Sequence, residues 1–124
     1  MTTRRELLLL STAALVASPL RAQTASPIRI GEINSYSTIP QFTVPYRMGW
    51  QLAVEEANAG GGLLGRKVEV ITRDDAGKPD DAIRLATELV SNEKVVLRAG
   101  TFLSNVGLAV AEFALRNKVL FVAA

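Results

Sequence analysis

Apolar and polar positions change period several times along this chain after residue 27, and each change predicts a new element. Short alternating or continuous apolar runs lie at residues 28–34, 67–72, 95–100 and 119–124, as is typical of strands. Between them, apolar side chains recur every three or four residues, as in helices that bury one face. The pattern therefore predicts four strands that alternate with three helices.

Local signals mark the ends of the predicted helices. The first, residues 46–58, is followed by the glycine-rich segment GGGLLG, which is poor helix material. The second opens at Pro79, and the acidic pair that follows suits the positive end of a helix dipole. The predicted inward positions are Tyr46, Trp50, Ala53 and Ala57, then Ala82, Leu85, Ala86 and Leu89, then Val106, Ala109, Val110, Phe113 and Ala114.

Strict alternation of strand and helix predicts the α/β fold class, with a parallel sheet, right-handed crossovers and helices on both faces. Ligands of such sheets bind beyond the carboxyl ends of the strands. Residues 34–45, 74–78 and 100–103, and whatever follows Ala124, are expected at that edge.

Residues 1–22 have the pattern of an export signal. Arg4 and Arg5 form a positive start, residues 7–18 are an apolar run, and residues 19–22 suit a cleavage region that extends to about residue 25. The run is shorter than the roughly 20 residues that span a bilayer. The arginine pair resembles a twin-arginine signal, and an ordinary secretory signal is the alternative. Both predict export, here to the periplasm.

Charge and composition exclude several function classes. Residues 1–22 hold Arg4, Arg5, Arg21 and Glu6, which leaves 11 basic and 11 acidic side chains in the rest of the chain. These charges are scattered, so no nucleic-acid surface is predicted. The sequence has no cysteine and no histidine, which excludes disulfides, Cys/His metal sites and catalytic pairs that use either residue. We expect neither a metal nor a cofactor.

Two segments invite comparison with phosphate sites. A nucleotide-binding glycine loop lies between a strand and the next helix, whereas GGGLLG leaves a helix and enters a strand. The segment RDDAG suggests the acidic pocket of a phospho-acceptor domain, but that pocket also needs an aspartate at the end of the third strand, where this chain has Gly100. Neither segment predicts phosphate chemistry.

Several motifs together carry a family resemblance: IRIGEINS, the helix end AVEEANAGGGLLGRK, the turn DDAGKP, and the later segments AGTFLS and NKVLFVAA. From about residue 28 to 124 the chain resembles the start of a leucine/isoleucine/valine-binding type of periplasmic solute-binding protein. The resemblance implies that residues 23–124 are an incomplete N-terminal lobe of that fold. It also implies a non-enzymatic component of an ABC importer, which binds branched-chain or hydrophobic amino acids and partners a membrane permease.

The resemblance also implies site residues. Ser104, at the start of the third helix, would bind the ligand carboxylate together with backbone N–H groups, and Asn105 follows it in the expected site. A hydroxyl, unpaired amides and a positive helix end suit an anion. Thr101 and Phe102 would offer backbone groups and an apolar wall, and Phe42 would stack on the ligand. Ser104 as an ordinary N-cap and Phe42 as a packing residue are the alternatives.

The chain departs from the family pattern in two places. It has Tyr36 and Ser37 where the family usually has a Ser-Gly pair, which leaves the ligand class open to other carboxylates such as aromatic acids. Family members are also several times longer and have two lobes, so we interpret the chain as a fragment or a truncated product. A sensor domain on the same fold and a small exported hydrolase are further alternatives, the latter limited to Ser-Lys or carboxylate pairs.

Overall fold

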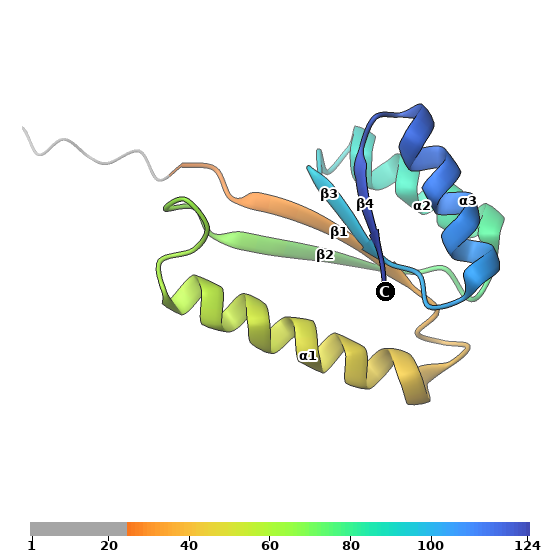
Figure 1. Cartoon of the computed structure of the whole chain (residues 1–124), viewed down its shortest axis with the longest axis horizontal. Helices are drawn as coiled ribbons and strands as arrows, with labels where there is room; N and C mark the ends of the chain where they lie inside the picture. The colour runs from red at the N-terminus through yellow and green to blue at the C-terminus, as the bar shows by residue number, and fades with distance from the viewer. Residues whose placement is uncertain (1–24) are drawn as a thin grey trace, which may run out of the picture.

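The computed structural model describes residues 25–124, so the export signal expected at residues 1–22 lies outside the described residues. Strands and helices alternate as predicted (Figure 1). They are β1 (Ile28–Asn34), α1 (Pro40–Ala59), β2 (Val68–Asp74), α2 (Pro79–Ser91), β3 (Leu97–Gly100), α3 (Ser104–Arg116) and β4 (Leu120–Ala123). In this part of the chain, none of the helices has the length and apolar character needed to cross a membrane.

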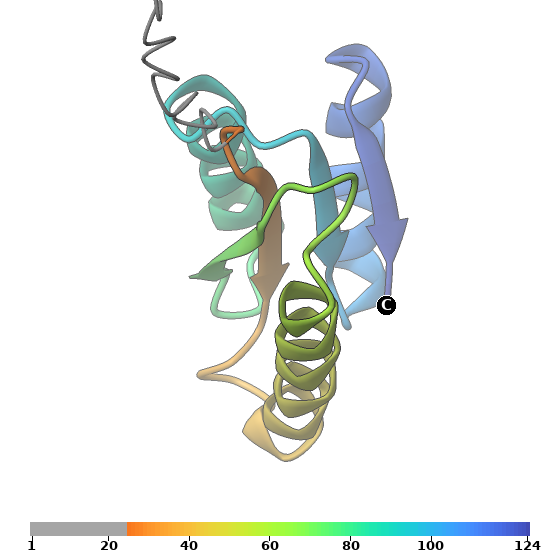
Figure 2. The ribbon, with the colours of Figure 1, turned by 90° about the vertical axis from the view of Figure 1, so that its left-hand side faces the viewer.

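The four strands form one parallel sheet in the order β2-β1-β3-β4. Helix α1 lies on one face, while α2 and α3 lie side by side on the other (Figures 1 and 2). The predicted α/β class, with helices on both faces of a parallel sheet, is therefore confirmed. Because all strands run the same way, the loops after β1, β2 and β3 meet at one edge of the sheet.

The hydrophobic core lies between the sheet and the α2–α3 layer. Ile33 of β1 and Val95, just before β3, are buried among the inward faces of the two helices. All four inward positions predicted for α2 are buried, and in α3 Val106, Val110 and Ala114 are buried as predicted. The period of the apolar pattern therefore correctly identified the faces that α2 and α3 bury.

Phe113 of α3 packs at the border of this core and covers a buried charge. The guanidinium carbon of Arg98 lies 4.5 Å from the centre of the Phe113 ring, and Arg98 is fully buried. Its Nη1 donates a hydrogen bond to the carbonyl of Ala86 at 3.3 Å. The ring therefore contributes both apolar contact and cation–π stabilisation.

We expect Phe113→Ala to lower the free energy of unfolding by about 3–5 kcal/mol, because it opens a cavity and uncovers the Arg98 guanidinium. Urea unfolding of the full chain and the variant, followed by circular dichroism, measures this loss. A loss below about 1 kcal/mol would show that the ring adds little to the core.

The prediction for the first helix is wrong at its start. The apolar pattern predicted a helix from residue 46 and a loop over residues 34–45, but α1 begins at Pro40 and includes Pro45. Proline has a φ angle that suits a helix, and Pro40 stands in the first turn, where its missing N–H is not needed. Pro45, further along, removes one backbone hydrogen bond, and the helix continues through it. The end at Ala59, before the glycine-rich segment, agrees with the prediction.

Helix α1 faces the sheet with its predicted stripe but does not pack closely against it. Tyr46, Trp50, Ala53 and Ala57 line a hollow of about 310 Å³ between α1 and the sheet. Thr43 is the buried residue of this helix. The face of the sheet toward α1 is therefore less completely filled than the face toward α2 and α3.

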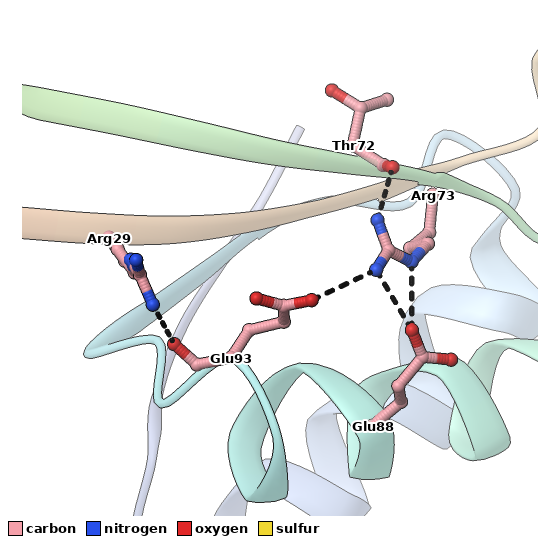
Figure 3. Close-up of polar contacts among 5 residues, drawn as sticks. All are labelled: Arg29, Thr72, Arg73, Glu88 and Glu93. Carbon is pink, nitrogen blue, oxygen red and sulfur yellow. Dashed lines mark hydrogen bonds and ion pairs between the residues drawn. The ribbon is translucent and has the colours of Figure 1, made fainter.

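Ion pairs join the last turns of α2, and the segment just after it, to the sheet (Figure 3). Arg73 of β2 donates hydrogen bonds to the carboxylate of Glu88 at 2.8 and 3.2 Å, and it lies 3.4 Å from the carboxylate of Glu93. Arg29 of β1 donates to the backbone carbonyl of Glu93 at 3.4 Å. These contacts link β1, β2 and the end of α2, so the orientation of the helix on the sheet does not depend on apolar contacts alone.

Candidate functional site

Three loops meet at the carboxyl edge of the sheet: residues 35–39 after β1, 75–78 after β2 and 101–103 after β3. Hydrogen bonds between side chains and backbone link all three. This edge is where the sequence pattern predicted a ligand site.

Asn34, the last residue of β1, connects two of the loops. Its side chain is buried, and its Oδ1 accepts hydrogen bonds from the N–H of Ser35 at 3.0 Å and of Phe102 at 3.1 Å. The second bond joins residues that are 68 positions apart. The loop after β3 is thereby held against the end of β1.

The two aspartates after β2 fix the other loops. Buried Asp75 accepts hydrogen bonds at Oδ1 from the Ser35 hydroxyl at 2.6 Å and from the N–H of Gly77 at 2.8 Å. Asp74 accepts from the N–H groups of Ser37 at 3.1 Å and Ala76 at 2.9 Å. Carboxylates bonded in this way stabilise loops, which gives the RDDAG segment a structural role in this protein.

Helix α3 opens toward this edge. It begins at Ser104, with Leu103 in the N-cap position, and among the described residues no side chain makes a capping hydrogen bond. Ser104 and Asn105 are both exposed. Ser104 is therefore not the ordinary N-cap that the sequence left as an alternative, and the first N–H groups of α3 and the Ser104 hydroxyl remain together at a positive helix end.

Two aromatic rings form an apolar wall beside this helix end. Phe42 of α1 and Phe102 of the loop after β3 are stacked, with ring centroids 5.1 Å apart and planes within 12°. The two residues are 53% and 46% exposed. The structure thus brings together two residues that the sequence analysis placed in the same site.

Thr101 occupies a different position from the other expected site residues. It is buried, its backbone has a left-handed φ of 69°, and its N–H donates to the carbonyl of Ile33 at 2.8 Å. Its hydroxyl donates to the carbonyl of Gly100. The N–H groups of Thr101 and Phe102 are therefore both engaged within the protein. Phe102 offers its ring, and Thr101 supports the loop from inside.

Glu32 of β1 is a buried carboxyl that sequence analysis missed. It is 2% exposed and lies on the α1 side of the sheet, next to Tyr36. Burial raises the pKa of Glu32 to about 7, against smaller opposing effects of the Tyr36 and Asn34 side chains and of Arg47. Burial also raises the pKa of Tyr36.

Glu32 and the other residues that sequence analysis missed share a recognisable signal. Glu32, Asn34 and Ser35 are polar residues at the end of a strand that a parallel sheet buries on both faces, and Asp75 follows the next strand. Buried polar residues at the carboxyl edge usually hold loops or ligands. Within residues 25–124, no group of three acidic, histidine or cysteine side chains is placed to hold a metal ion.

The structure combines a parallel α/β sheet, linked loops at its carboxyl edge, an open helix end and an aromatic wall. These features are typical of domains that bind small molecules. The chain belongs to the periplasmic binding protein family, whose sequence model matches residues 27–124. The resemblance seen in the sequence motifs is thereby confirmed.

Individual relatives agree with this assignment. The Leu/Ile/Val-binding protein BraC3 of Rhizobium johnstonii is 34% identical over 113 residues, which is 90% of this chain and 30% of the relative. Among solved structures, LivJ of Streptococcus pneumoniae in complex with isoleucine has 30% identity and a TM-score of 0.71, over 78% of this chain and 28% of LivJ. A solute-binding protein of Rhodopseudomonas palustris in complex with benzoate has 28% identity and a TM-score of 0.70, over 78% of this chain and 27% of that protein. The chain therefore spans less than a third of the length of each.

Proposed function

We propose that this chain contributes one wall of the ligand site in an extracytoplasmic solute-binding component of an ABC importer, and that the solute is a small carboxylate. The observation that carries the proposal is the open start of α3, where exposed Ser104 and uncapped amides face the carboxyl edge of the sheet in a member of the periplasmic binding protein family. The cargo would pass to a membrane permease. The role is binding, not catalysis, in keeping with relatives that are named as solute-binding proteins.

Hydrophobic amino acids, the branched-chain ones above all, are the leading solute class. The relatives that support it are named as Leu/Ile/Val-binding proteins or contain isoleucine. A second candidate is an aromatic acid. The exposed stacked pair of Phe42 and Phe102 favours it, and solved relatives hold benzoate and 3,4-dihydroxybenzoic acid. A planar ring can extend such a stack, whereas a branched side chain can only contact its edge or face.

We expect Ser104→Ala to weaken binding of a carboxylate solute by roughly tenfold or more. A hydrogen bond to a charged group contributes about 1.5–3 kcal/mol, and about 1.4 kcal/mol is a tenfold change in affinity. The stability of the fold should change by less than about 0.5 kcal/mol, because Ser104 makes no capping bond within the described residues.

The measurement is calorimetric titration of leucine, isoleucine and benzoate. The protein used is a fusion that continues from Ala124 into the BraC3 polypeptide beyond its matching segment, called the BraC3 fusion below. Asn105→Ala is the matched control, since Asn105 is also exposed, lies one residue further into α3 and should matter less. Equal affinities of the parent fusion and Ser104→Ala would remove Ser104 from the site.

We also propose that the chain is exported by the twin-arginine route. Replacing Arg4 and Arg5 with lysine should leave the precursor in the cytoplasm, because lysine keeps the charge but lacks the planar guanidinium. Immunoblots of cytoplasmic and periplasmic fractions measure the result. Normal processing of the double variant would instead indicate the general secretory route.

A further inference from the structure

Glu32 lies where β1 approaches the end of β3, close to the loop that carries Phe102. The side chain is buried, and its Oε1 is 3.1 Å from the position that a Cβ atom would occupy on Gly100, the last residue of β3. Thr101 and Phe102 follow Gly100 directly in the chain. A carboxyl group is therefore buried just behind the edge at which we place the solute, and the role proposed for Ser104 does not use it.

The Asn34 side chain connects Glu32 to the loops. Residues 32 and 34 are two positions apart in β1, so their side chains project from the same face of the sheet. Because Asn34 Oδ1 accepts hydrogen bonds from the N–H groups of Ser35 and Phe102, the Nδ2 group is the part of the carboxamide that can donate. Hydrogen bonding by the Asn34 side chain lowers the pKa of Glu32 against the larger effect of burial, as a bond donated to a carboxylate does.

Tyr36 and Trp50 continue this set of polar contacts toward α1. The Tyr36 hydroxyl interacts with the Glu32 carboxyl, and the Trp50 indole of α1 interacts with the Tyr36 hydroxyl. These contacts are longer or less well aligned than the bonds at Asn34 Oδ1, since neither oxygen of Glu32 has a partner in regular hydrogen-bond geometry among residues 25–124. A row of buried polar groups thus runs from α1 through Tyr36 and Glu32 to Asn34.

We propose that Glu32 is a positioning residue of the solute site: its carboxyl accepts from the Asn34 carboxamide and thereby fixes the oxygen that holds the loops after β1 and β3. The proposal rests on the proposed function, because it assigns Glu32 a role at the same site. A carboxamide bonded only at its oxygen can still turn, whereas one bonded at both ends has a single orientation. The loop fixed in this way carries the Phe102 ring and leads into the open start of α3.

Replacement of Glu32 by leucine separates a positioning role from a merely structural one. Burial of a carboxylate costs stability, so Glu32→Leu should make the chain more stable at pH 8. The same variant removes the acceptor of the Asn34 carboxamide, so the loop after β3 should become looser and solute binding weaker. A purely structural residue would instead change the stability of the fold and the order of the loop in the same direction.

Hydrogen exchange of the Phe102 amide, followed by NMR in the full chain and in the BraC3 fusion, measures the loop directly, because this N–H is bonded to Asn34 Oδ1. Exchange should be faster by about tenfold or more in Glu32→Leu. It should stay within about threefold of the parent in Glu32→Gln, which keeps a side-chain oxygen for Asn34. The Thr101 amide is the internal control, since it donates to the backbone carbonyl of Ile33 and does not depend on Asn34.

The pH dependence of the Phe102 amide shift identifies Glu32 as the group behind the effect. In the parent chain the shift should titrate with a midpoint near the Glu32 pKa of about 7, and the titration should vanish in Glu32→Gln and Glu32→Leu. Both variants keep the other charged and titratable groups that face Glu32, which are Tyr36, Tyr46, Arg47 and Asp75. Calorimetric titration of leucine, isoleucine and benzoate into the fusion should show affinity reduced about threefold or more in Glu32→Leu and near that of the parent in Glu32→Gln.

Three results would overturn the proposal. The first is exchange of the Phe102 amide in Glu32→Leu at the rate of the parent. The second is Glu32→Gln that behaves like Glu32→Leu, which would assign the effect to the charge rather than to the bond with Asn34. The third is faster exchange with unchanged affinity for a solute that the parent fusion binds. A parent fusion that binds none of the three solutes would overturn the proposed function, whereas the exchange rate of Phe102, measured without solute, still decides whether Glu32 positions the loop.

Discussion

Gly100→Ala is expected to lower the free energy of unfolding by about 4 kcal/mol or more, so that a large fraction of the molecules is unfolded. Gly100 ends β3 with a φ of +108°, a conformation that costs a residue with a Cβ atom about 1–3 kcal/mol. A Cβ atom would also lie 2.2 Å from the carbonyl oxygen of Ile33. That atom belongs to the backbone of the central strand, so neither side of the contact can move without disturbing the sheet.

Thermal unfolding by circular dichroism measures the effect. Gly49→Ala is the matched control, because Gly49 lies in the interior of α1 and a methyl group added there would have open space within 4 Å. The control should stabilise the chain by up to about 1 kcal/mol through helix propensity. If Gly100→Ala melted within a few degrees of the parent chain, the close approach of β1 and β3 would be wrong.

The stability of the chain should fall by on the order of 3 kcal/mol between pH 5 and pH 8 because of Glu32. The pKa of Glu32 is raised from 4.5 to about 7 in the folded state, chiefly by burial. Below pH 4.5 the carboxyl is neutral in the folded and the unfolded chain, and burial costs little. Between pH 4.5 and 7 the unfolded chain loses this proton while the folded chain keeps it, so stability falls across that interval and levels off above about pH 7.

Glu32→Gln isolates this contribution from those of the exposed acids. The variant should be more stable than the parent at pH 8 and should show a flatter dependence of stability on pH. Urea unfolding at several pH values measures both properties. An identical pH dependence in the two proteins would mean that the carboxyl ionises freely and that the site around Tyr36 is wetter than the structure indicates.

The sequence predicted the fold most accurately where apolar period and local signals agreed. Helix α2 has a proline and two acids at its start and four apolar positions on one face, and all four are buried. Helix α1 was predicted six residues too short because the apolar stripe that located it begins at Tyr46, whereas the structure continues the helix back to Pro40. The first turns of α1 carry no such stripe, and Thr43, the buried residue there, is polar.

The candidate site was predicted in part. The junction after β3 could be recognised from its motif, and the structure places Phe102 against Phe42 and Ser104 at an open helix end. The hydrogen bond from the Phe102 N–H to the Asn34 side chain joins residues 68 positions apart, so no local sequence pattern could predict it. Glu32 was visible as an acid within a buried strand, but its raised pKa depends on its burial beneath α1, which no local pattern shows.

The carboxamide of Asn34 sets the spacing of the two loops that border the proposed solute site. One oxygen atom fixes the start of the loop after β1 and the residue that carries the Phe102 ring. Because both segments are bonded to the same oxygen atom, we expect them to move together rather than separately. We therefore expect the separation of these two segments to be set at the end of β1, so that selection among solutes of different breadth depends on the outer side chains of the two loops.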